Sequence, residues 1–214
     1  VEEEIKLATE VKFKIILPGR IFISRAIGED IITRYMRSDF MRYSSDFVYY
    51  DTPDWDLCEN GYLLRVCTSG DSNAATLRCG SIDQSGTPGL YTGQGWTTYF
   101  HSTDSIVEDY MRRGAHSQFE EYASRGALDV RFSSHRERMR ANLYLPERTR
   151  LDFALDDGEL TVDGRSEPLR HMSFTLSYGD LGLMTNYCEQ IMREFGLSPD
   201  LVTMQRKAVR LLRS

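Results

Sequence analysis

Segments in which polar and apolar residues alternate recur along this chain, and they constrain its fold more than any other feature. The longest covers residues 2–17, and others cover 134–144, 150–155 and 169–176. Successive side chains of a β-strand point to opposite faces, so a period of two indicates strands with one packed face and one polar face. The sequence therefore predicts a sheet of long strands with one apolar, packed face and one polar face.

Shorter strands and several helices complete the prediction. Strands are expected at 47–50, 61–67, 74–79 and 96–100, with a ragged strand beginning at Leu90. The spacing of apolar residues predicts helices at 28–41, 104–111, 118–123 and 180–195, and Ser198 opens a last helix that reaches Leu212. The Asp-Gly step within 156–159 predicts a hairpin turn.

The length of 214 residues is enough for one large domain with a sizeable core. The chain contains no repeat and no linker, so we expect a single α+β domain over residues 1–214, dominated by antiparallel strands. Four cysteines stand singly, without the close pairs of a zinc site or the density of a disulfide scaffold, and we expect them to be reduced.

The composition excludes several classes of protein. The formal net charge is -6 and the pI about 5.3, which argues against a nucleic-acid-binding surface. Hydrophobic residues make up 41% of the chain, yet no apolar run approaches the ~20 residues that span a bilayer. The acidic N-terminus is unlike a signal peptide, so we expect a cytoplasmic protein, either a monomer or a homodimer, with no membrane partner.

Basic residues dominate the polar faces of the predicted strands, although the protein is acidic overall. A solvated sheet face is the ordinary interpretation of any one such strand. Five strands with the same bias indicate a different arrangement, because their side chains would converge if the sheet closes. A closed interior lined by Lys and Arg attracts a compact polyanion such as triphosphate, polyphosphate or a nucleotide. The side chains concerned are Lys14, Arg65, Arg78, Arg136 and Arg138.

One stretch resembles a known family. Tyr-Tyr-Asp-Thr-Pro-Asp-Trp-Asp-Leu at 49–57, followed by Leu-Leu-Arg-Val at 63–66, is similar to the most recognisable segment of the CYTH family, the triphosphate tunnel metalloenzymes. The resemblance implies a closed or nearly closed antiparallel eight-stranded β tunnel with helices packed outside. It also implies binding of a triphosphate-bearing substrate, with Mg²⁺ or Mn²⁺ held by carboxylates, and hydrolysis or cyclisation of that substrate.

The basic half of the family pattern carries over to this sequence. Lys14 matches the Lys that closes an N-terminal Glu-x-Glu-x-Lys signature, and Arg65 matches the Arg of Leu-Arg-Val. The resemblance makes these two the candidate catalytic residues. The expected substrate-binding residues are Lys12, Lys14, Arg65, Arg78, Arg136, Arg138 and Lys207.

The acidic half carries over only in part. Glu10 and Asp156 are the expected metal ligands, and in a second register of the N-terminal signature Glu2 and Glu4 would take this role with Lys6. Elsewhere the family's carboxylates are replaced. Mg²⁺ prefers carboxylate and water oxygens in near-octahedral geometry, so these replacements weaken the metal site. The replacing residues are Gly95, His171, Ser173 and Thr175.

Three hypotheses of function follow. The first is a tunnel protein that binds a triphosphate-type polyanion through Lys and Arg without hydrolysing it. The second is an active, divergent triphosphatase that depends on Mg²⁺ or Mn²⁺ and acts on triphosphate or nucleoside triphosphates. The third is a structural or partner-binding domain with a vestigial tunnel.

Overall fold

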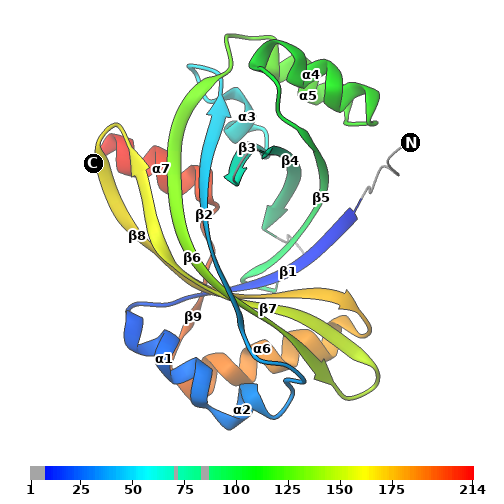
Figure 1. The fold of residues 1–214 in the computed structure, drawn as a ribbon, viewed down its shortest axis with the longest axis vertical. Helices are drawn as coiled ribbons and strands as arrows, with labels where there is room; N and C mark the ends of the chain where they lie inside the picture. Colours follow the sequence, from blue (N-terminus) through cyan, green and yellow to red (C-terminus); the bar gives the residue numbers. More distant parts are fainter. Residues whose placement is uncertain (1–7, 70–71, 83–86) are drawn as a thin grey trace.

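The structure is a computed structural model, and it describes residues 8–69, 72–82 and 87–214. Eight antiparallel strands form one sheet in the order β5-β4-β3-β2-β6-β7-β8-β1, and pairing of β1 with β5 closes this sheet into a tunnel (Figure 1). The closed tunnel that the sequence predicted is confirmed. The strands are β1 (Ala8–Ile16), β2 (Met41–Asp51), β3 (Tyr62–Ser69), β4 (Ser72–Ile82), β5 (Leu90–Tyr99), β6 (Asp129–Leu145), β7 (Thr149–Val162) and β8 (Arg165–Tyr178).

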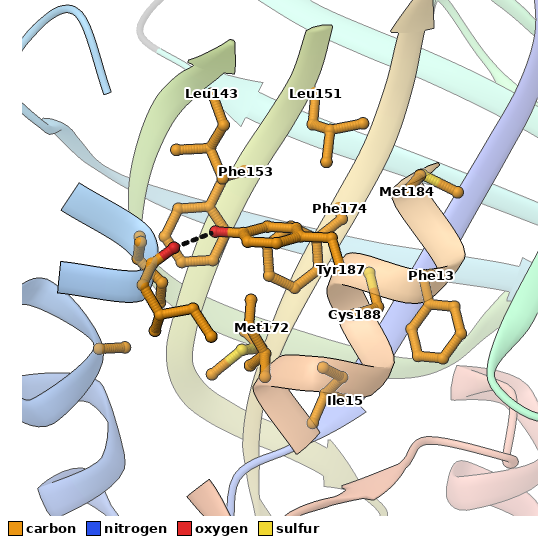
Figure 2. Packing of buried hydrophobic residues seen from close by; sticks show 14 of the residues in the cluster. Phe13, Ile15, Leu143, Leu151, Phe153, Met172, Phe174, Met184, Tyr187 and Cys188 are labelled. Atoms are coloured by element: carbon orange, nitrogen blue, oxygen red, sulfur yellow. Dashed lines mark hydrogen bonds between the residues drawn. The ribbon is translucent and has the colours of Figure 1, made fainter. Parts of the chain in front are cut away.

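Three helices cover one outer side of the tunnel. α1 (Arg20–Gly28), α2 (Asp30–Thr33) and α6 (Leu181–Phe195) lie against the outward faces of β1, β7 and β8 (Figure 1). Figure 2 shows the core between these layers, in which Phe153 and Phe174 stack with ring centroids 4.9 Å apart and the Tyr187 hydroxyl donates to the Ile31 carbonyl oxygen at 2.9 Å. Each fully buried side chain of this size contributes about 1.5–3 kcal/mol to folding.

A second core lies outside β3, β4 and β5. It is covered by α3 (Asp56–Glu59), α4 (Thr103–Arg112) and α5 (Ser117–Ala123). Leu64, Leu77 and Trp96 point into this core and are fully buried. Because side chains alternate along a strand, the neighbouring positions of β3 and β4 point into the tunnel. Arg65 and Arg78 therefore face the interior.

The last helix, α7 (Met204–Arg213), lies on the inner side of β7. Its residues Met204 and Ala208 pack on Leu160 and Val162, which share a face of β7 with Asp156. α7 therefore covers part of the interior. A two-residue strand, β9 (Ser198–Pro199), precedes it and pairs with the end of β1.

The segment that carries the family resemblance has a structural role. The Asp51 carboxylate, at the end of β2, accepts hydrogen bonds from the backbone N–H groups of Thr52, Leu57 and Cys58 at 2.8–2.9 Å. These contacts hold the turn that leads through α3 into β3. The motif thus sets the β2–β3 connection, and Arg65 lies four residues into β3.

The hairpin turn predicted at 156–159 is wrong. β7 runs straight through this segment, and the turn to β8 lies at Asp163 and Gly164, whose φ angles are 47° and 74°. Gly158 instead sits where β6 approaches closely, because a Cβ there would lie 2.1 Å from the carbonyl oxygen of His135. The Asp163-Gly164 step forms the turn, whereas Gly158 allows β6 and β7 to lie close together.

Two helix predictions are also wrong in position. Instead of one helix at 28–41, α1 ends at Gly28 and α2 is short, because the apolar residues that pack inward begin earlier, at Phe22 and Ile23. The last helix begins at Met204 rather than near Ser198, because Ser198 and Pro199 extend the sheet and Thr203 caps the helix. Within 8–69, 72–82 and 87–214, none of the helices combines the length and apolar character that crossing a bilayer demands.

Candidate functional site

All seven predicted substrate-binding residues lie on the interior side of the sheet or on α7. Alternation along β1 places Lys12 and Lys14 opposite the buried Phe13 and Ile15, and so inside the tunnel. Their surroundings show that the basic groups converge from different strands. The charge of Lys14 interacts with Arg78 of β4, Arg136 of β6 and Lys207 of α7.

A cavity of about 320 Å³ opens beside these groups. Lys12, Lys14 and Arg78 line one side of it, and the start of α7, residues 203–206, lines another. Tyr91 of β5 forms a further part of the wall. Such a volume suits a small ligand, and the basic side chains and helix N-terminus favour one that is negatively charged.

Tyr91 fills space beside two glycines of the neighbouring backbone. It lies over Gly80 and Gly93, and a Cβ at Gly93 would come within 2.6 Å of the Tyr91 hydroxyl oxygen. Nothing in the sequence indicated that an aromatic side chain covers these two glycines.

Several interior cations are neutralised by carboxylates. Glu10 accepts a short hydrogen bond from Lys12, and its second oxygen lies 2.8 Å from Arg78 Nη1. On α7, Lys207 Nζ donates to Asp200 Oδ2 at 2.7 Å. Nothing in the sequence indicated the role of Asp200, because β9 is too short to be predicted.

A third neutralised group lies in the middle of β6, β7 and β8. Arg138 Nε and Nη2 donate to the two oxygens of Asp156 at 2.6 and 2.7 Å. His171 Nε2 lies 2.7 Å from Asp156 Oδ2, and the carboxylate is 0% exposed. Burial raises the pKa of Asp156, but its contacts with His171 and Arg138 outweigh burial and hold this pKa well below its usual range. Asp156 is therefore ionised and fully engaged.

Three interior cations have no such partner. Among the described residues, no carboxylate lies within 4 Å of the charged groups of Lys14, Arg65 or Arg136. Arg136 is 5% exposed, and its Nη2 donates a short hydrogen bond to the Tyr49 hydroxyl. The guanidinium carbons of Arg65 and Arg136 lie 4.6 and 4.7 Å from the centroid of the Phe47 ring.

Burial and mutual repulsion change the acidity of these groups. Burial, with Arg136 and Arg78, lowers the pKa of Lys14 to about 8, although Asp200 raises it. Burial and Arg78 lower the pKa of Lys12 to about 7, and burial and Arg78 lower that of Arg65 to about 9. An added anion would restore these charges.

The expected metal ligands do not fit a shared divalent ion. Asp156 pairs with His171 across β7 and β8, and His171 pairs with Ile16 across β8 and β1. Asp156 therefore lies level with Ile16, which is six residues along β1 from Glu10. Six residues of a strand span roughly 20 Å, whereas Mg²⁺ binds oxygen at about 2.1 Å. The described residues contain no group of three His, Cys, Asp or Glu side chains arranged to hold a metal. Their role as ligands stays a prediction, and the alternative register with Glu2, Glu4 and Lys6 lies outside the described residues.

His171 occupies a position where the family pattern has carboxylates. It is 3% exposed, and burial lowers its pKa, with Lys14 and Arg136 adding to the effect and Asp156 opposing it. Its Nδ1 has no hydrogen-bond partner among the described residues. Where the family pattern has carboxylates, this chain thus has a buried histidine that contacts Asp156. Alternation placed His171 on the polar face of its strand, but nothing in the sequence indicated this contact.

The fold and the interior together define a closed antiparallel β tunnel with a mainly basic lining. Solved structures with this fold include HpAC1 from Hippeastrum, described as a candidate adenylyl cyclase with a dominant triphosphatase activity, at a TM-score of 0.56 and 13% identity over 91% of this chain and 92% of that one. A candidate adenylate cyclase from Bacillus halodurans has a TM-score of 0.56 and 14% identity over 92% and 96% of the two chains.

The PH1819 protein from Pyrococcus horikoshii has a TM-score of 0.51 and 14% identity over 94% and 98%. The CYTH-type fold that the sequence resemblance predicted is thereby confirmed. The sequence matches no protein-family model, and it matches none of the curated proteins.

Proposed function

We propose that the tunnel binds a triphosphate-type polyanion through Lys14, Arg65 and Arg136 and does not hydrolyse it. The observation that carries this proposal is that, within residues 8–69, 72–82 and 87–214, no carboxylate pairs with these three interior cations, while their neighbours are paired. Moving a charge out of water without a partner is strongly unfavourable. A bound polyanion supplies the missing charge.

The class of anion follows from the number and type of donors. Arg guanidinium groups bind phosphate oxygens in a bidentate manner, and Lys acts as a point charge. The charge of Arg136 on β6 interacts with those of Lys14 on β1 and Arg65 on β3, so a compact anion with several phosphate groups uses these donors better than a single phosphate. The triphosphatase activity described for HpAC1, which shares the fold, supports the same class.

A second candidate is an active triphosphatase that depends on Mg²⁺ or Mn²⁺. The activity described for HpAC1 favours it. The pairing of Glu10 and Asp156 with protein cations disfavours it, because a metal ion would have to displace Lys12, Arg78 or Arg138.

Titration calorimetry with sodium triphosphate at fixed ionic strength tests the proposal. Arg136→Met should weaken binding about tenfold or more, because it removes charged hydrogen bonds to phosphate. Arg140→Met is the matched control: Arg140 lies on the same strand but is paired with Asp152, and its loss should change the affinity less than threefold.

Phosphate release is measured in parallel with Mg²⁺ and with Mn²⁺. We expect no release above that of a Lys14→Ala variant. Turnover clearly above this background would establish the second candidate. Failure of the native protein to bind triphosphate in any buffer would refute the proposal and favour a vestigial tunnel.

A further inference from the structure

The two interior carboxylates expected to hold a metal each already have a cation at both oxygens. Asp156 Oδ1 accepts from Arg138 Nε at 2.6 Å, and Oδ2 accepts from Arg138 Nη2 at 2.7 Å. Glu10 contacts Lys12 through one oxygen and Arg78 through the other. A divalent ion bound at either carboxylate would have to break these contacts.

Breaking them would be costly at Asp156. The carboxylate is 0% exposed and the Arg138 side chain is 28% exposed, so a displaced guanidinium would remain largely buried with no acid beside it. Removing one partner of a buried ion pair leaves an uncompensated charge, which is strongly destabilising. The protein cations therefore hold these positions against a metal ion.

Distance gives an independent reason. Glu10 pairs with Gly93 near one end of β1, and Asp156 lies level with Ile16 at the other. Neither carboxylate can complete the coordination of an ion held by the other. The basic groups, in contrast, come from β1, β3, β4, β6 and α7 and surround the interior.

We infer that the tunnel binds its polyanion as the metal-free species, with Arg138 beside Asp156, and Lys12 and Arg78 beside Glu10, taking the place that a divalent ion would have at these carboxylates. This inference rests on the proposed function and specifies its ligand. Mg²⁺ added to the solution complexes the anion, lowers its charge and so competes with the protein.

Calorimetry with sodium triphosphate in EDTA and in excess Mg²⁺, at matched ionic strength, tests the inference. We expect triphosphate to bind at least as tightly in EDTA as in Mg²⁺. The expected size of the effect is about tenfold weaker binding in Mg²⁺, a difference of about 1.4 kcal/mol. Tighter binding in Mg²⁺ than in EDTA would overturn the inference while leaving the proposed function intact. No binding in either buffer would instead refute the proposed function itself.

Arg138→Gln provides a second test. With the guanidinium removed, the Asp156 charge should repel the anion, so affinity in EDTA should fall about tenfold and Mg²⁺ should recover part of it. Arg140→Gln removes a similar pair with Asp152 from the same two strands and should show no recovery by Mg²⁺. Equal recovery in both variants would contradict the inference.

A different variant, Arg78→Gln, provides the same test if Arg138→Gln does not fold. It frees one oxygen of Glu10, at a position where both side chains are 20–26% exposed. The same pattern is expected: weaker binding in EDTA than the native protein, and partial recovery in Mg²⁺. Unchanged affinity in EDTA would count against a role of this cation in place of a metal.

Discussion

Replacing Arg65 by Met should make the protein more stable and abolish most of its affinity for the anion. Arg65 lies inside the tunnel with no carboxylate nearby among the described residues, and its Nε has no hydrogen-bond partner there. Met has a similar length and can pack its thioether on the Phe47 ring, over which the guanidinium now lies. The change therefore removes an unfavourable charge with little loss of packing.

The magnitude follows from the pKa of the guanidinium. Burial and Arg78 lower the pKa of Arg65 from 12.5 to about 9, a shift that corresponds to roughly 5 kcal/mol against the charged form. Solvent reaches part of the side chain, and the cation–π contact with Phe47 is lost, worth about 0.5–1 kcal/mol. We expect a net gain on the order of 2 kcal/mol in the free energy of unfolding.

Urea unfolding without ligand measures the stability, and calorimetry with triphosphate measures the affinity. The affinity should fall about tenfold or more, because charged hydrogen bonds to phosphate are lost. Arg140→Met is the control, since Arg140 is paired with Asp152 and its loss should not stabilise the protein. An Arg65→Met variant that is less stable than the native protein and still binds triphosphate normally would refute the reasoning.

The remaining predictions concern pH and two structural residues, Gly158 and Asp51. The pKa values of Lys12 and Lys14 are about 7 and 8 in the folded protein, below the unfolded value of 10.5, so the unfolded chain binds more protons. The free energy of unfolding of the ligand-free protein, measured with urea, should therefore rise by on the order of 2 kcal/mol from pH 7 to pH 9. A flat profile would argue against buried amines. Gly158→Ala should destabilise the protein by more than about 2 kcal/mol, because a Cβ there meets the β6 backbone at 2.1 Å, and a melting temperature equal to that of Gly28→Ala, where a Cβ has open space, would contradict this contact. Asp51→Ala should lower stability by about 1–3 kcal/mol, since three backbone N–H groups lose their acceptor, while triphosphate affinity measured on the remaining folded protein should hardly change.

Alternation along the strands predicted which side chains share the polar face, and the family resemblance predicted that the sheet closes. Adjacent residues of a strand point to opposite faces, so one buried residue determines the face of its neighbour. Phe13 and Leu64 are buried in the outer cores, and Lys14 and Arg65 therefore point into the tunnel. The same rule could not locate the hairpin turn after β7. Asp157-Gly158 and Asp163-Gly164 have the same chemistry, and only the close approach of β6 distinguishes them.

The pairing of charges inside the tunnel could not be predicted. Which carboxylate neutralises which cation depends on register between strands that are distant in sequence, such as Arg138 opposite Asp156 and His171 opposite Asp156. Register is set by turn geometry and packing, which the alternation of one strand does not contain. The sequence shows which cations face inward, and the register determines which of them remain without a partner.

The position of β1 has a consequence for how the protein is made. This first described strand pairs with β5 at residues 90–95, with β8 at 171–175 and with β9 at 198–199, and with no strand that directly follows it. Contacts of such long sequence separation form slowly, and during synthesis the partners in β8 and β9 emerge after those in β5. Until then, β1 exposes unpaired N–H and C=O groups that can pair with another chain. Lys12 and Lys14 therefore join the other basic groups only after residues 171–199 have been synthesised.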